Sequence, residues 1–442
     1  MATEVNKIST AADDETATEA ATIKKWSRLF EHYQNGLSTN QAGSSTDTTA
    51  SRLHRGGGSI RGNRNRGGSG SGSVLLSRSN LAVVSGGGGP GASAGNASNP
   101  SFLSPATPYA SLRASPRRKT HTSLTGSPFA ASSASSSSAS SDPLSKIRHT
   151  IVTTPLPSDS VLTSTGTTYR SVVWKLLLDI RSLPVAEYLS LVAKGKSPSH
   201  EKIRNDTFRT LATDQGFKER VKEEKLIRLL DAFVWKFNGG HGGYGSSTSS
   251  SVSQRNDEVY EFSYVQGMNV LAAPFLYTHK SEVEAFYSFS RFIEYCCPLY
   301  VQPTLSGVHR GLQLLDRCLE LLDEPLYRHL RSRNLSAEIY AFPSVMTLCA
   351  CTPPLPEVLQ LWDFLLAFGV HFNVLCIVAQ LHIMRNELLE SQSPMKLLRH
   401  LPPLNARKII NVTVTLARDI PKELYHDLVK HPYHPDGVVG LL

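Results

Sequence analysis

Two short segments of this sequence carry side chains whose types and spacing could do chemistry. Asp206 and Arg209 stand three residues apart, so a helix would place the carboxylate and the guanidinium on one face. A carboxylate one turn back can hold a guanidinium by charge-assisted hydrogen bonds and limit its rotamers. Further along, the run Tyr264-Val-Gln-Gly-Met-Asn forms a polar turn hinged at Gly267, and this turn can present the Gln266 amide outward.

Each segment also has a simpler explanation. An Asp–Arg pair at this spacing is common on helix surfaces, where it contributes about 0.2–0.5 kcal/mol. Gln266 could be a helix-entry residue whose amide caps the backbone, and Gly267 is consistent with both interpretations. Only the presence of both segments in one chain favours function over ordinary structure.

The elements that would position these residues are predicted to be helices. Apolar side chains keep helical spacing in three runs that follow Asp206, and no strand-like alternation of useful length competes with them. Prolines 325, 356 and 421 stand where helices could start, and Gly369 stands where one could stop. The sequence therefore predicts an all-α region of about 290 residues, preceded by a long disordered region of low complexity.

The chain divides by composition into the following expected parts. Residues 1–17 and 38–142 are rich in Ser, Gly, Ala and Thr and are predicted to be disordered. Between them, residues 18–37 form an amphipathic helix with Trp26 and Phe30 on its apolar stripe. The large domain spans 143–401 with a flexible insertion at 238–256, and residues 402–442 add a helical extension and a tail. The helix at 18–37 would either dock a partner or pack onto the domain, and the second is favoured because isolated helices of this length are marginal.

Charge and composition limit the classes of partner and site. The net charge is +9, but much of the visible clustering of Arg and Lys lies in the disordered part, where the Arg-Gly runs between 55 and 68 are interpreted as solvated linker; no nucleic-acid partner is expected. The six cysteines show no C-x-x-C pair and are expected to be reduced thiols. The histidines at 241, 431 and 434 lack metal-ligand spacing, so no metal site is predicted.

No membrane segment is expected either. Met1 to Asp14 carries acidic and polar residues where a signal peptide would be apolar. The longest apolar run, Leu359 to Ile383, is interrupted by polar residues and is predicted to form two buried helices in place of a transmembrane helix.

The two segments, written I-x-x-D-x-x-R (203–209) and Y-x-Q-G-M-N (264–269), together resemble the TBC (Rab-GAP) domain, a helical GTPase-activating module. The resemblance extends over residues 143–401. It includes the pattern R-x-x-x-W at Arg170 and Trp174, which the family uses structurally, and an L-P…W-D segment ending at Trp362 and Asp363. We interpret Trp362 as a core residue and Asp363 as a buried hydrogen-bond partner.

The resemblance implies a function in trans. Hydrolysis of GTP needs a water held in line and positive charge near the phosphoryl oxygens, and many small GTPases supply the second poorly. The family implies that Arg209 and Gln266 are inserted into a small Ras- or Rab-like GTPase, with Asp206, Tyr264 and Gly267 supporting them. The chain would then contribute catalytic residues without being a hydrolase itself. It would need no cofactor, because GTP and magnesium belong to the partner.

Two further features narrow or qualify this interpretation. Residues 340–356 lack the tryptophan that most TBC domains carry before W-D, and this variant resembles the fungal branch of the mitotic-exit and septation networks. That branch implies a negative regulator that works with a scaffold co-subunit in the cytoplasm, at spindle pole bodies. The alternative is a catalytically inactive adaptor of the same fold.

In the low-complexity segment, Ser115-Pro-Arg-Arg-Lys has the form of a cyclin-dependent kinase site and is a phosphorylation candidate.

Overall fold

The computed structural model describes residues 18–31, 143–212, 214–238, 260 and 262–434. Helices account for the regular structure of these residues. No strand occurs among them, and their only sheet-like contact is an isolated antiparallel bridge between Leu162 and Thr168. The predicted all-α fold is confirmed for this part of the chain.

The helices of the domain follow one another closely. Their bounds in chain order are α2 (Pro143–Thr153), α3 (Tyr169–Leu177), α4 (Val185–Ala193), α5 (His200–Thr207), α6 (Gln215–Arg220), α7 (Glu223–Asn238), α8 (Met268–Thr278), α9 (Glu282–Cys296), η1 (Pro298–Tyr300), α10 (Ser306–Leu322), α11 (Glu324–Ser332), α12 (Ala337–Tyr340), α13 (Phe342–Met346), α14 (Leu355–Phe368), α15 (Phe372–Ile383), α16 (Arg385–Glu390), α17 (Pro394–Arg399), α18 (Ala406–Leu416), η2 (Ala417–Asp419) and α19 (Lys422–Lys430).

Local sequence explains where several of these helices begin and end. Pro325 and Pro356 occupy the first turns of α11 and α14, where a missing N–H costs nothing. Gly369 ends α14 with a φ of 116°, a conformation that L side chains rarely adopt. Ser281 starts α9 with a reciprocal capping box to Glu284. The predicted helix starts at Pro325 and Pro356 and the predicted stop at Gly369 are confirmed, and the run from 359 to 383 forms two buried helices, α14 and α15, as expected.

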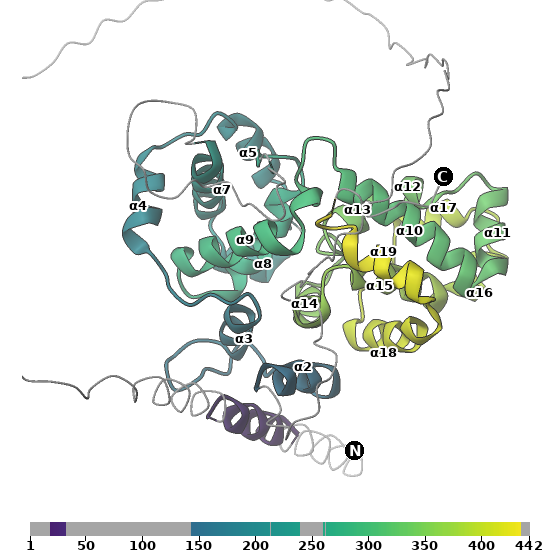
Figure 1. Ribbon diagram of the computed structural model, residues 1–442, viewed down its shortest axis with the longest axis horizontal. Helices are drawn as coiled ribbons and strands as arrows, with labels where there is room; N and C mark the ends of the chain where they lie inside the picture. The colour runs from purple at the N-terminus through teal and green to yellow at the C-terminus, as the bar shows by residue number, and fades with distance from the viewer. Residues whose placement is uncertain (1–17, 32–142, 213, 239–259, 261, 435–442) are drawn as a thin grey trace, which may run out of the picture. The chain divides into compact units, whose positions relative to one another are not determined.

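Two groups of helices meet along a central seam. Figure 1 shows α4, α5, α7, α8 and α9 on one side and α10 to α13 with α15 to α19 on the other, and α14 lies between them. Trp362 of α14 stacks on Phe292 of α9 with ring centroids 5.3 Å apart, and Trp174 of α3 meets Phe275 of α8 edge-on at 5.4 Å. Both tryptophans are almost fully buried. Truncating either to alanine is expected to cost about 3–5 kcal/mol.

The N-terminal helix (residues 18–31) packs against the domain. Trp26 is fully buried, and its indole N–H donates to the Pro155 carbonyl at 3.0 Å. Phe30 stacks on Tyr169 at 5.5 Å, and the Ser27 hydroxyl lies 2.8 Å from the Tyr169 hydroxyl. This is the arrangement favoured from the sequence, in which the helix joins the fold of the downstream domain.

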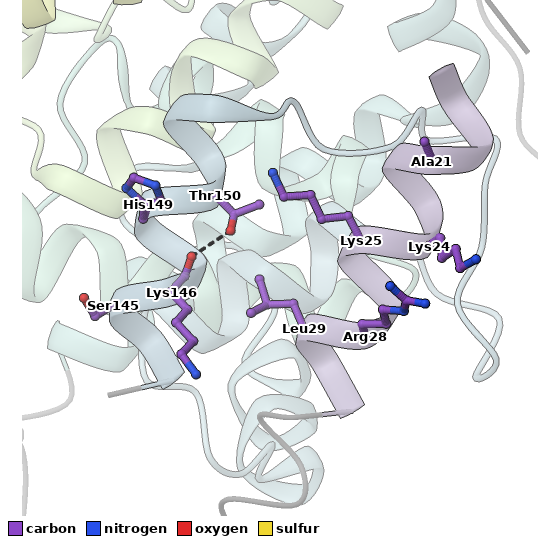
Figure 2. Close-up of a pocket in the computed structure, with 9 residues that line it drawn as sticks. All are labelled: Ala21, Lys24, Lys25, Arg28, Leu29, Ser145, Lys146, His149 and Thr150. Carbon is purple, nitrogen blue, oxygen red and sulfur yellow. Dashed lines mark hydrogen bonds between the residues drawn. The ribbon is translucent and has the colours of Figure 1, made fainter. Parts of the chain in front are cut away.

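A basic groove of about 760 Å³ remains between the N-terminal helix and α2. Its lining includes Lys24, Lys25 and Arg28 from the N-terminal helix and Lys146 and His149 from α2. Figure 2 shows the Lys25 side chain extending from the first helix towards α2. Lys25 donates to the Thr154 hydroxyl, which links the two walls at one end. None of the described side chains that line this groove is acidic, so positive charge accumulates on it.

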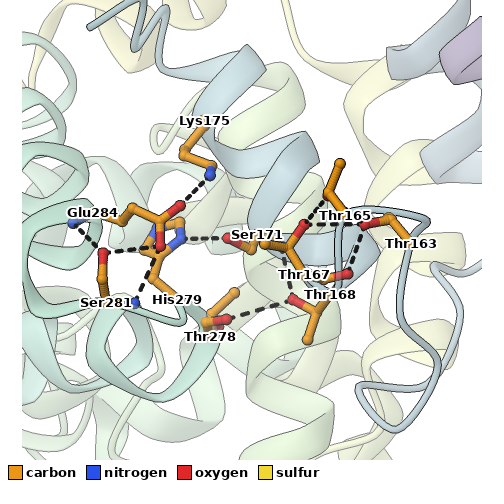
Figure 3. A network of polar contacts seen from close by, with 10 residues as sticks. All are labelled: Thr163, Thr165, Thr167, Thr168, Ser171, Lys175, Thr278, His279, Ser281 and Glu284. Atoms are coloured by element: carbon orange, nitrogen blue, oxygen red, sulfur yellow. Dashed lines mark hydrogen bonds and ion pairs between the residues drawn. The ribbon is translucent and has the colours of Figure 1, made fainter. Parts of the chain in front are cut away.

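A polar network ties α3 to the loop between α8 and α9. Figure 3 shows Lys175 paired with Glu284, and the Ser171 hydroxyl 2.8 Å from His279 Nδ1. His279 is one of three histidines, with His371 and His431, that are enclosed by the core and are called here the buried histidines. Burial lowers the pKa of His279 and His371 to about 3 and that of His431 to about 4, so all three are neutral at physiological pH.

Several predictions fall outside the described residues. These are the disorder of residues 1–17 and 38–142, the phosphorylation candidate Ser115, residues 32–37 of the expected N-terminal helix, residues 239–256 of the insertion with its histidine, and the tail beyond residue 434. The domain limits at 143, 401 and 402 also stay predictions, although α18 and α19 lie within the expected extension.

Candidate functional site: two turns joined by buried hydrogen bonds

The first turn follows α5. Ile203, Asp206 and Thr207 form the buried face of this helix. The sequence predicted one helix over both Asp206 and Arg209, and this is wrong in one respect: α5 ends at Thr207, and Arg209 lies in the turn beyond the C-cap Phe208. The ion pair still forms, with Arg209 Nη2 2.5 Å from Asp206 Oδ1, because Phe208 keeps right-handed helical torsion angles.

The second turn leads into α8. Gly267 is the N-cap with a φ of 104°, and a Cβ at this position would lie 2.9 Å from Met346 Cε. A side chain at this position is therefore strained by the backbone conformation, and it would also require the end of the Met346 side chain in α13 to move. The Gln266 side chain is exposed and has no hydrogen-bond partner within the described part of the chain. The alternative in which its amide caps α8 is not what the structure shows, because Asn269 Oδ1 accepts from the Gly267 N–H at 3.1 Å.

Buried hydrogen bonds connect these two turns, which are 58 residues apart in sequence. The Tyr264 hydroxyl donates to Asp206 Oδ2 at 2.9 Å. The Asn269 amide donates to the Thr210 hydroxyl at 2.8 Å and to the Asp206 carbonyl at 3.3 Å. The Thr210 hydroxyl in turn donates to the Asp206 carbonyl at 3.1 Å. Since all these groups are buried, the position of one turn fixes the position of the other.

The pair at the first turn is asymmetric in exposure. The Asp206 side chain is 10% exposed and accepts a hydrogen bond on each oxygen, whereas the Arg209 side chain is 56% exposed. Burial and the neighbouring Asp206 carboxylate raise the pKa of Tyr264 well above its usual value, so its hydroxyl stays protonated and remains a donor. Asp206 is therefore a fixed anchor for a guanidinium whose outer end is free to meet a partner.

Sequence reasoning missed Asn269 and Thr210. Asn269 was part of the motif but received no role, and it is only 4% exposed. Its position in the first turn of an apolar helix is a usable signal, since a buried amide must find partners. Nothing in the sequence indicates that the partner is Thr210, 59 residues upstream.

A separate cluster lies where α3 meets α14. This seam cluster consists of Arg170, Trp174, Asp363 and Asp159. Arg170 Nε lies 3.0 Å from Asp363 Oδ1, and Trp174 Nε1 donates to the same oxygen at 2.7 Å. A third carboxylate contact, from Arg170 Nη1 to Asp159 at 2.6 Å, was not anticipated. Burial raises the pKa of Asp363 to about 6 against the opposing effect of Arg170, so the carboxylate is ionised at neutral pH. Arg170, Trp174 and Asp363 are buried and brace α3 against α14, whereas the Asp159 side chain is 17% exposed.

Other candidate ligands are placed elsewhere. The part of the chain that the structure describes contains no group of three or more His, Cys, Asp or Glu arranged to hold a metal ion. His431 is occupied by hydrogen bonds to the Tyr300 hydroxyl and the Leu428 carbonyl, and none of the six cysteines forms a disulfide. Within the same residues, no helix is both long and apolar enough to span a bilayer.

A family model decides what these motifs belong to: residues 167–389 match the Rab-GTPase-TBC domain. The chain belongs to the Rab-GTPase-TBC family. The matched range contains both turns and the seam cluster apart from Asp159, so the site described above lies within the TBC domain. Membership implies a small GTPase as partner.

The chain is similar to two yeast proteins over most of the length of each of them. Cell division control protein 16 of Schizosaccharomyces pombe is 44% identical over 299 residues, 68% of this chain and 91% of that protein. Mitotic check point protein BUB2 of Saccharomyces cerevisiae is 37% identical over 296 residues, 66% of this chain and 93% of that protein. Among solved structures, the Ypt/Rab-GAP domain of Gyp1p is 18% identical with a TM-score of 0.48, covering 62% of this chain and 92% of that one. The predicted family is confirmed by the family model, and its mitotic branch by the two yeast proteins.

Proposed function

We propose that this chain is a GTPase-activating protein that inserts Arg209 and Gln266 into the nucleotide site of a small Ras- or Rab-like GTPase. The observation that supports this most strongly is the buried network of Asp206, Tyr264 and Asn269. It fixes two turns against each other while leaving the Arg209 and Gln266 side chains exposed. Because the two turns are held rigidly and the Arg209 and Gln266 side chains are exposed, this arrangement suits the simultaneous insertion of both side chains into a partner.

Each exposed group has a defined task in this proposal. Arg209 stabilises the charge that develops on the phosphoryl oxygens, and an arginine supplied in trans accelerates hydrolysis by about 10³- to 10⁵-fold. That factor corresponds to about 4–7 kcal/mol off the barrier. Gln266 orients the attacking water in place of the partner's own glutamine. Asp206 and Gly267 hold the two groups in position, and GTP and magnesium remain with the partner.

The relatives support a cellular role for this activity. Their names connect them with cell division control and a mitotic check point. We therefore place the chain as a negative regulator of mitotic exit or septation signalling, which works with a scaffold co-subunit in the cytoplasm at spindle pole bodies. This cellular role is tested by asking whether the full chain binds a co-subunit, and whether that co-subunit changes the rate at which the chain stimulates GTP hydrolysis by one GTPase.

Single-turnover GTP hydrolysis against a panel of small GTPases tests the central proposal. Arg209→Lys should lose most of the acceleration, because lysine offers a point charge where a planar fork is needed. Gln266→Ala should slow hydrolysis even for a GTPase that has its own glutamine. The matched control is Arg204→Lys, which changes another exposed arginine of the same segment, paired with Glu201, and should keep the parental rate.

The outcomes separate the alternatives. Near-parental stimulation by Arg209→Lys would contradict insertion of the arginine. An unaffected rate for Gln266→Ala would make Gln266 a turn residue only. Binding of a GTP-loaded partner without any stimulation, alone or with candidate co-subunits, would instead identify the chain as an adaptor of the TBC fold.

A further inference from the structure

Phe208 is an exposed aromatic residue between the anchor Asp206 and Arg209. Phe208 is 68% exposed, the highest value for a large apolar residue in the described part of the chain. The next highest values are those of Leu189 at 57% and Leu162 at 54%. Single exposed apolar residues are ordinary on protein surfaces and need no explanation by themselves. What distinguishes Phe208 is its place in the turn that carries Arg209.

The reach of an arginine side chain decides what must cover Phe208. An extended guanidinium lies about 7 Å from its own Cα, and consecutive Cα atoms are 3.8 Å apart. A GTPase whose phosphates meet Arg209 therefore approaches within side-chain distance of residue 208. The turn cannot move away from the GTPase, because Asp206 and Thr210 are hydrogen-bonded to Tyr264 and Asn269.

The chemistry of the surrounding face indicates what Phe208 can contribute. The exposed residues of α5 nearest to it are polar: Arg204, 59% exposed, is paired with Glu201, and Asn205 is exposed as well. Among the exposed residues from Glu201 to Thr210, Phe208 is thus the only apolar one. Aromatic side chains in such positions supply much of the binding energy when a partner buries them, whereas rim charges supply little.

We propose that Phe208 is an affinity and specificity determinant that inserts into an apolar depression on the GTPase surface beside the bound nucleotide. This inference rests on the proposed function, because it takes the GTPase as the occupant. Phe208 touches neither nucleotide nor water in this scheme. It stabilises the complex in which Arg209 acts, so its loss raises the concentration of GTPase needed and leaves the chemical step unchanged.

The test measures single-turnover hydrolysis as a function of chain concentration, with the full chain and the GTPase that responds best in the panel. Phe208→Ser should raise the half-saturating concentration by about tenfold, as expected for a buried aromatic anchor. Phe208→Leu should raise it less, because part of the apolar contact remains. Both variants should reach a rate at saturation within about twofold of the parent. Leu321→Ser, at a 49% exposed leucine of α10, is the control and should change neither quantity.

Equal half-saturating concentrations for Phe208→Ser and the parent would overturn the inference, as would a rate at saturation that falls while half-saturation stays constant. Unchanged thermal melting of the variants excludes misfolding as the cause. Binding of the parent and variants to the GTPase loaded with a non-hydrolysable GTP analogue separates the two proposals. If the parent binds without stimulating hydrolysis, the proposed function fails, and weaker binding of Phe208→Ser still supports the contact. If the parent binds no GTPase of the panel, both fail.

Discussion

Replacing Asn269 by alanine should weaken the connection between the two turns, leaving the hydrogen bond from Tyr264 to Asp206, without touching either exposed group. The amide makes three hydrogen bonds of good length: to the Thr210 hydroxyl at 2.8 Å, from the Gly267 N–H at 3.1 Å and to the Asp206 carbonyl at 3.3 Å. A fourth contact, from the Tyr264 hydroxyl, is longer at 3.4 Å. Alanine removes all of them and leaves a buried N–H without its acceptor.

The size of the effect follows from these contacts. A buried hydrogen bond contributes about 1 kcal/mol net, so three of them predict a loss of about 3 kcal/mol in the free energy of unfolding. For a domain of this size the melting temperature falls by about 2 °C per kcal/mol, hence by about 6 °C. A misplacement of about 1 Å at a catalytic group can cost up to a hundredfold in rate. We therefore expect stimulated hydrolysis at saturating GTPase to fall by about tenfold or more.

The control must lose similar stability at a distant place. Asp323 caps α11 by accepting from the Leu326 N–H at 3.2 Å and also accepts from Arg385 at 2.7 Å. Asp323→Ala should lower the melting temperature comparably and leave the rate at saturation unchanged, because α11 lies far from α5 in Figure 1. If Asn269→Ala melts lower but hydrolyses at the parental rate, the network stabilises the fold without positioning the catalytic groups, and our reasoning about the site is refuted.

Three more predictions concern other parts of the chain. The pKa of the buried histidines is about 3 to 4 in the folded chain, below about 6.5 in the unfolded chain, so stability is present above pH 6.5 and is lost as the pH falls; between pH 7 and 5.5 each should cost about 1 kcal/mol. Urea denaturation at both pH values should show this loss, and His279→Gln should reduce it by about 1 kcal/mol; identical pH dependence of the variant and the parent would contradict this prediction. Gly267→Ala should destabilise by about 1–3 kcal/mol through backbone strain and the contact with Met346, more than Gly195→Ala, whose φ of 71° is also positive but whose Cβ would meet nothing within 4 Å. Thermal melts of the two variants compare them directly, and equal losses would mean that the Met346 contact is relieved without cost. Ser115→Ala should change partner binding after kinase treatment and leave the rate at saturating partner unchanged, because phosphate would cancel local positive charge in a segment with no predicted core; equal binding of variant and parent would contradict this.

The fold was largely predictable because its signals are local. Proline at 356 and glycine at 369 bracket α14, and both act through the torsion angles of their own residues. Trp362 was predicted to lie in the core from the resemblance of its segment to the family, and its indole is buried. Such signals need no knowledge of the partner helix.

The geometry of the site was less predictable because it depends on contacts between distant segments. The spacing of Asp206 and Arg209 indicated a pair but not that the helix ends between them. The sequence around Phe208 was equally compatible with a buried or an exposed ring. The packing of the neighbouring helices decides which of the two occurs. The acceptor of the Asn269 amide lies 59 residues away, and no periodicity carries that information.

The contacts of Arg209 explain why an arginine suits this turn better than a lysine. A guanidinium has five N–H donors in a planar fork. The hydrogen bond from Nη2 to Asp206 occupies one edge of this fork and leaves donors on Nη1 and Nε for a phosphoryl group. In the proposed insertion, Arg209 would therefore keep its anchor while it binds, and less rotamer entropy would be lost because the anchor has already limited the side chain. A lysine ammonium has three donors on a single atom, so contact with both Asp206 and a phosphoryl oxygen would draw the carboxylate towards the anionic nucleotide. Since Asp206 is itself fixed by Tyr264, the turn cannot shift to relieve that repulsion.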